Sequence, residues 1–97
     1  MQQKDLYNQF EELSEKLGIR IVKGKGDFIG GECTLNNEKV IVVNKLKPME
    51  HRLKILAIIF MDYNLDSIYV VPYLRSFIEN FRSLDLYFKR FYLGEKN

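Results

Sequence analysis

The sequence contains no tryptophan, one cysteine, one histidine and two prolines in 97 residues. A single cysteine, Cys33, excludes a disulfide within the chain, so a reducing compartment is expected. The longest uninterrupted apolar run is seven residues, 55–61, far short of the roughly 20 that a membrane-spanning helix needs. The N-terminal residues MQQKDLYNQFEEL are too polar for a secretory signal peptide. A cytoplasmic protein without a membrane span is therefore predicted.

The chain also has little excess of one sign of charge over the other. The formal net charge is +2, too small by itself to favour a nucleic-acid or membrane partner. The distribution is uneven, because residues 19–54 hold eight basic and four acidic side chains, a net charge of +4. Four lysines of this region form a candidate basic patch: Lys23, Lys25, Lys45 and Lys47. The string KGKG at 23–26 lacks the spacing of a P-loop, which favours a solvated connection over a phosphate-binding loop.

The spacing of the apolar residues predicts one α+β domain over residues 1–97. Apolar side chains recur at helical spacing over residues 3–17, and Gly18 is placed to end that helix. Three strands are predicted next, over residues 19–22, 28–35 and 38–43.

Short local signals predict how these strands and the remaining helices are joined. Asn36 and Asn37 tolerate the positive φ of a two-residue hairpin loop, so the second and third strands are predicted to be antiparallel. Gly30 and Gly31 predict a bulge or a close backbone approach. Prolines open two further helices, over about 48–62 and from Pro72. The order α-β-β-β-α-α predicts a small antiparallel three-stranded sheet with helices packed on one face.

The second predicted helix is the centre of the domain. Residues 55–61, ILAIIFM, turn through nearly two helical turns, so apolar side chains cover every direction. A helix that is apolar all round is buried on all sides. We therefore expect protein around most of its circumference.

The segments LSEKLGIRI, GGECTLNNEKVIVVN and MEHRLKILAIIFMDY, in this order, resemble the small core of the ImmA/IrrE-type zincin-like metallopeptidases over residues 5–80. In that family the buried helix carries H-E-x-x-H after a Leu-Ala pair. Here the pair is followed by Ile58, Ile59, Phe60, Met61 and Asp62. Two histidines one turn apart and a glutamate base are needed for that zinc site, and isoleucine can neither bind a metal nor move a proton. The resemblance implies a degenerate relative, a pseudoenzyme without a metal cofactor.

The string GDFIGGEC at 26–33 also resembles a recurrent feature of small bacterial proteins, which implies no activity.

Three polar side chains remain as candidates for an atypical hydrolase site. His51 has Lys54 and Ile55 at the positions where a second helical metal ligand would lie, so a partly exposed helix residue is favoured. Cys33 is favoured as a small buried strand residue over a nucleophile served by His51. Asp62 alone is not a metal site. None of these observations predicts a cofactor.

The C-terminal stretch is unusually rich in apolar residues. Residues 84–93, here called the aromatic segment, hold Leu84, Leu86, Tyr87, Phe88, Phe91, Tyr92 and Leu93 with Lys89 and Arg90 among them. The third helix either continues to about residue 92 or breaks near Ser83, and a break is favoured. One helix in a small domain cannot bury all these side chains, which favours a protruding or swapped helix over residues 83–97. Packing of one face on the chain's own domain is an alternative, as is a contact with nucleic acid or a membrane surface.

These observations favour a non-catalytic interaction module that self-associates through Leu84, Tyr87, Phe88, Phe91 and Tyr92. A protein partner other than a second copy would use the same surface. Weak nucleic-acid binding through the basic patch and the aromatic segment is the alternative, because aromatic and basic side chains together can stack on single strands.

Overall fold

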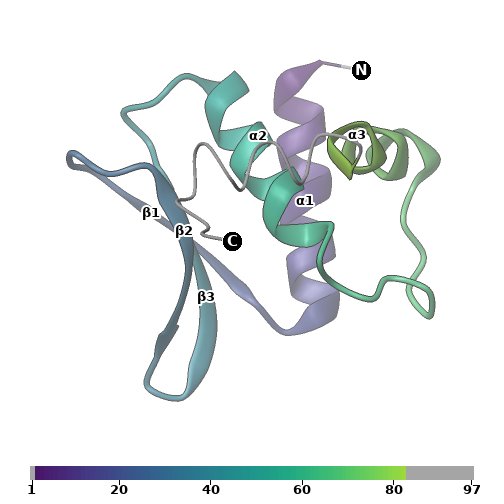
Figure 1. The fold of residues 1–97 in the computed structure, drawn as a ribbon, viewed down its shortest axis with the longest axis horizontal. Helices are drawn as coiled ribbons and strands as arrows, with labels where there is room; N and C mark the ends of the chain where they lie inside the picture. The colour runs from purple at the N-terminus through teal and green to yellow at the C-terminus, as the bar shows by residue number, and fades with distance from the viewer. Residues whose placement is uncertain (1, 83–97) are drawn as a thin grey trace, which may run out of the picture.

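The computed structural model describes residues 2–82, and these form three helices and three strands (Figure 1). The elements are α1 (Gln3–Leu17), β1 (Arg20–Gly24), β2 (Gly30–Leu35), β3 (Glu38–Asn44), α2 (Met49–Phe60) and α3 (Pro72–Arg82). The α+β class, the element order and the opening of the third helix at Pro72 are confirmed. The predicted break near Ser83 and the aromatic segment lie outside the described residues.

The three strands form one mixed sheet in the order β1-β3-β2. β2 and β3 are antiparallel and are joined by Asn36 and Asn37, whose φ angles are 53° and 67°. This hairpin confirms the prediction, since both loop residues adopt the left-handed conformation that such a turn requires.

The expectation of a wholly antiparallel sheet is wrong for β1. This strand runs parallel to β3, with Arg20 opposite Val40 and Gly24 opposite Asn44. The connection over residues 25–29 crosses the end of β3, so β1 pairs with the side of β3 that β2 leaves open. The crossing makes β3 the central strand, which accounts for its run of four β-branched apolar residues.

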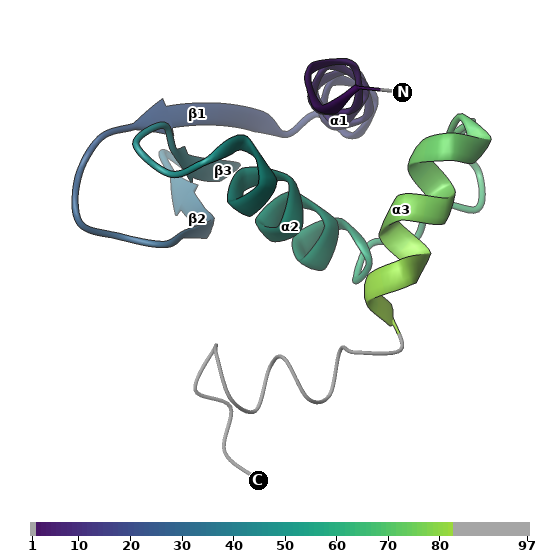
Figure 2. The same ribbon diagram turned by 90° about the horizontal axis from the view of Figure 1, so that it is seen from above.

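All three helices lie to one side of the sheet, which we call its inner side (Figures 1 and 2). α1 contacts β1, and α2 contacts β2 and β3. α3 packs on α1 and α2, farther from the sheet. The arrangement confirms that helices pack on one face and shows that α3 forms an additional layer.

The core confirms α2 as the central buried helix. Leu56, Ala57 and Phe60 are fully buried, and Ile58 is 4% exposed. Aromatic rings join the three helices at this point, because Phe10 of α1 stacks on Phe60 at 5.8 Å and meets Phe77 of α3 edge-on at 6.0 Å. Each helix therefore contributes to one shared core.

Candidate functional site

The parallel pairing of β1 with β3 brings together the four lysines of the predicted basic patch. The carboxyl ends of parallel strands lie at the same edge of a sheet, and Lys45 N donates to Gly24 O at 2.9 Å across this edge. Lys23 is the penultimate residue of β1 and Lys25 follows its end, while Lys45 and Lys47 follow the end of β3. Both views show the β1–β2 and β3–α2 loops side by side at this end of the sheet (Figures 1 and 2). We call this surface the basic edge.

Asn44 holds the two loops of the basic edge together. Its side chain is 1% exposed, and Nδ2 donates to the carbonyl oxygens of Gly26 at 2.7 Å and Phe28 at 2.6 Å. Its Oδ1 accepts from Leu46 N at 3.0 Å. All polar groups of this buried amide therefore have partners, and both lysine-bearing loops depend on it.

Two side chains from the first turn of α2 contact backbone carbonyl oxygens of the basic edge. Arg52 Nε donates to Lys47 O at 3.1 Å, and His51 Nε2 lies 3.3 Å from Ile29 O. Pro48, the N-cap residue of α2, makes no side-chain capping hydrogen bond. Lys25 and Lys45 are exposed and belong to none of the ion pairs among residues 2–82. The edge is thus a positively charged surface on a fixed backbone.

Lys23 differs from the other lysines because it points to the inner side. Its ammonium lies 5.5 Å from the ring centroid of Tyr7 in α1. The Tyr7 hydroxyl is buried without a hydrogen-bond partner among the described residues. Burial raises the pKa of Tyr7 above its ordinary value, Glu11 raises it further, and Arg52 opposes them. Tyr7 therefore stays neutral at physiological pH.

Cys33, His51 and Asp62, the three candidates for an atypical hydrolase site, do not lie together in the structure. Cys33 is exposed on β2, and strand alternation places it on the face opposite Glu32, which bonds to Tyr63 after α2. His51 lies on α2, on the inner side, so the sheet separates its side chain from the thiol. Asp62 is exposed beyond the end of α2. Within residues 2–82 no three side chains of the His, Cys, Asp and Glu types converge as metal ligands.

Ile58 and Ile59, which the resemblance to the zincin-like core would place at metal-ligand positions, pack in the core. Ile58 belongs to the buried apolar cluster, and Ile59 packs against it partly buried. No polar cleft is formed by these two side chains. The likeness to the zincin-like core remains a hypothesis that rests on the sequence.

An apolar groove lies between the three helices, and we call it the aromatic groove. It encloses about 270 Å³ and is lined by Gln3, Leu6, Glu50, Leu53, Lys54, Tyr73, Phe77 and Phe81. Tyr73 is 44% exposed, and Phe77 and Phe81 are half-buried. Phe77 and Phe81 stand four residues apart in the sequence, which places them on one side of a helix. The sequence gives no sign of the groove itself, because α1 and α2 supply the other wall.

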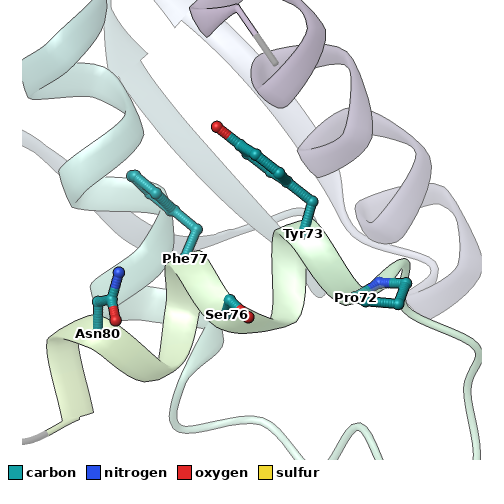
Figure 3. A pocket seen from close by; sticks show the side chains of 5 residues that line it. All are labelled: Pro72, Tyr73, Ser76, Phe77 and Asn80. Carbon is teal, nitrogen blue, oxygen red and sulfur yellow. The ribbon is translucent and has the colours of Figure 1, made fainter.

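A second hollow adjoins the aromatic groove along α3. It is lined by Pro72, Tyr73, Ser76, Phe77 and Asn80, so Tyr73 and Phe77 belong to both. Figure 3 shows these two aromatic rings rising from the same side of α3 toward the space between α1 and α2. Together the two hollows give α3 an accessible aromatic surface.

A polar network joins the end of α2 to the sheet. The Tyr63 hydroxyl donates to Glu32 Oε2, and the Lys39 ammonium lies 3.9 Å from the same oxygen and 5.3 Å from the Tyr63 ring. Burial, followed by the hydrogen bond to Glu32 and its negative charge, raises the pKa of Tyr63 to about 12. This network is structural, since it fixes the chain where α2 ends.

No protein-family model, curated protein or solved structure matches this chain. Within residues 2–82 no helix has the length and apolarity needed to cross a bilayer. The described structure is a small α+β fold with two surface features, the basic edge and the aromatic groove.

Proposed function

We propose that this chain is a non-catalytic protein-interaction module that associates with a second copy of itself through its aromatic segment. The observation that supports the proposal is the partly exposed aromatic side of α3, where Tyr73 is exposed and Phe77 and Phe81 are half-buried. Tyr73, Phe77 and Phe81 follow one another at four-residue spacing and line accessible hollows. This row ends two positions before Ser83, after which the aromatic segment follows. An exposed aromatic surface that continues into more aromatic residues is typical of a protein–protein interface.

Light scattering coupled to gel filtration tests the proposal on the full chain at 1 to 100 micromolar, on the order of the dissociation constants expected for such small interfaces. We expect a mass of twice 11.5 kDa. Phe88→Asp combined with Phe91→Asp should reduce the mass to one chain. Tyr69→Ser is the matched control, because Tyr69 is 69% exposed and lies outside both hollows. A wild-type monomer throughout this range would contradict the proposal, as would a dimer that survives the double substitution.

The cytoplasm is the compartment that fits this proposal. Cys33 is an exposed thiol and the sole cysteine of the chain. In an oxidising compartment such a thiol is prone to pair with other chains. A reducing environment keeps it available as a thiol.

Nucleic-acid binding is the second candidate, and the basic edge favours it. Lysines that are far apart in the sequence lie on two adjacent loops, which Asn44 holds together. We expect weak binding of single-stranded DNA or RNA at low salt, with an affinity that falls steeply as salt rises. Lys45→Glu should weaken it several-fold. Lys4→Glu makes the same change of charge on α1 and should leave binding unchanged. Failure of the wild-type chain to shift labelled strands at low salt would rule this candidate out.

A further inference from the structure

We propose that the basic edge docks this chain on a lipid bilayer whose surface carries anionic headgroups. The docking is independent of self-association, because it uses neither the aromatic groove nor the aromatic segment. It takes the same surface as the nucleic-acid candidate and assigns to it a different ligand. The basis is a pair of exposed aliphatic side chains, Ile29 and Leu46, with lysines around them.

Leu46 stands at the tip of the turn that follows β3. The turn is closed by Lys47 N, which donates to Asn44 O at 3.0 Å, and the N–H of Leu46 donates to Asn44 Oδ1 at 3.0 Å. Turn tips usually hold glycine or polar residues. The Leu46 side chain is nevertheless 64% exposed, the largest fraction for any aliphatic side chain in residues 2–82. An apolar side chain held in water on a fixed turn favours a contact that removes it from water.

Ile29 lies on the neighbouring loop, close to this tip. The carbonyl oxygen of Phe28 and the N–H of Leu46 bind the same Asn44 side chain, at 2.6 Å and 3.0 Å. Ile29 follows Phe28 directly and is 49% exposed. The two loops lie side by side at this end of the sheet (Figures 1 and 2). One amide group therefore brings two exposed aliphatic residues to one surface, although two strands separate them in the sequence.

Lysines surround this aliphatic pair. Lys45 and Lys47 are the chain neighbours of the leucine, and Lys25 lies on the other loop. Asp27 is the one acidic residue of the two loops, which leaves them a net charge of +2. Anionic headgroups attract such a cluster, and each lysine near the surface strengthens the binding. The cytoplasmic leaflet of a membrane is the anionic one, which agrees with the compartment proposed above.

The aliphatic pair favours a bilayer over a nucleic acid. Phosphate groups of either partner attract lysines, but single strands also need aromatic rings on which the bases stack. Phe28, the one aromatic residue of the two loops, is half-buried against Gly24 and Gly26. Ile29 and Leu46 have neither a ring nor a hydrogen-bonding group. At a bilayer they enter the boundary between headgroups and acyl chains, where their exposed surface leaves water.

Co-sedimentation of the full chain with vesicles tests this docking. At physiological salt we expect binding to phosphatidylcholine vesicles with about one third phosphatidylserine, and much weaker binding to pure phosphatidylcholine. Leu46→Ser should weaken binding about fivefold to tenfold, because it removes apolar surface without changing the charge. Lys45→Glu should weaken it by about tenfold or more. Leu35→Ser is the matched control and should bind like the wild type, since Leu35 is 50% exposed at the hairpin end of β2, the opposite end of the sheet.

The absence of tryptophan from the chain allows a direct measurement of insertion. Leu46→Trp adds a single such fluorophore at the turn tip, and we expect its emission to move to shorter wavelength with anionic vesicles. Leu35→Trp places the same fluorophore at the opposite end of the sheet and should show no shift. Lipids brominated in their acyl chains should quench the emission only at position 46.

Other ligands of the basic edge would give different results. Labelled single strands that bind while anionic vesicles do not would assign the edge to nucleic acid and overturn the docking. Release from vesicles by millimolar inorganic phosphate, at matched ionic strength, would indicate a site for the free anion and would also overturn it. Equal effects of Leu46→Ser and Leu35→Ser, in variants whose circular dichroism matches the wild type, would show that no insertion occurs. Light scattering measures self-association separately, so the failure of either proposal leaves the other intact.

Discussion

Asn44 is a buried polar side chain that follows four apolar strand residues and ends β3. Its amide donates to two carbonyl oxygens of the loop that crosses the strand end. Each such hydrogen bond contributes about 0.5–1.5 kcal/mol to stability. The position of the basic edge relative to α2 therefore depends on one side chain that itself bears no charge.

Asn44→Ala should lower the free energy of unfolding by about 2–4 kcal/mol, because two carbonyl oxygens and Leu46 N lose their partner. Urea denaturation at neutral pH measures this change. Asn64→Ala is the control, since Asn64 is exposed and accepts one hydrogen bond, from Asp66 N. Its cost should stay below about 1 kcal/mol. Equal effects of the two substitutions would show that the loops do not depend on Asn44.

The raised pKa of Tyr63 predicts how the stability of the fold changes at high pH. Burial, with the hydrogen bond to Glu32 and its charge, raises its pKa in the folded state to about 12, above the value of about 10 for an unfolded chain. The unfolded state therefore releases this proton first. The stabilisation is complete below pH 10 and is lost as the pH rises toward 12.

Denaturation series between pH 8 and pH 11 on the wild-type chain, with Tyr63→Phe and Tyr69→Phe, measure this effect. We expect Tyr63→Phe to flatten the decline in stability above about pH 10, which is where an unfolded tyrosine ionises. Tyr69→Phe should leave the decline unchanged, because Tyr69 is exposed. A decline of the same slope in Tyr63→Phe would contradict the assignment.

At the scale of elements, β2 shows why two adjacent glycines are not equivalent. Gly30 has a φ of 114°, and a Cβ there would lie 2.8 Å from the carbonyl oxygen of Val42. At Gly31 nothing lies within 4 Å of that position. The sequence predicted a bulge or a close approach at this pair, and the structure assigns the close approach to the first glycine.

Gly30→Ala should therefore cost about 2–4 kcal/mol of folding free energy, from the unfavourable φ and the contact with Val42 O. Gly31→Ala should change stability by less than about 1 kcal/mol, because the site has room and an ordinary φ. Thermal unfolding followed by circular dichroism compares the two variants. A larger loss in Gly31→Ala would show that the strand is arranged differently.

Local signals in the sequence predicted single elements well and their pairing less well. Gly18, Pro72 and the Asn36–Asn37 loop determine helix ends and one turn through their own backbone preferences. The parallel pairing of β1 was missed, because residues 25–29 are short enough for a hairpin and nothing local indicates that the chain crosses the end of β3.

At the scale of the whole molecule, both candidate surfaces depend on packing between segments distant in sequence. The four lysines could be identified from the sequence, but their convergence follows from the β1–β3 pairing. The aromatic groove needs residues of all three helices. Sequence patterns give the chemical character of each element, while the surface formed by several elements depends on strand order and helix docking.

Phe10 offers a test of whether these elements form one cooperative unit. It is fully buried and contacts the rings of Phe60 and Phe77, so it joins the three helices. Phe10→Ala should lower the free energy of unfolding by about 3–5 kcal/mol, a large share of the roughly 5–15 kcal/mol typical of a domain.

Phe28→Ala is the control, because that half-buried ring lies against Gly24 and Gly26 of the sheet edge and should cost only about 1 kcal/mol. We expect circular dichroism and tyrosine fluorescence to report one coincident transition in both variants. Two separate transitions would show that the helices and the sheet unfold independently, and the single-domain prediction for residues 1–97 would then be wrong.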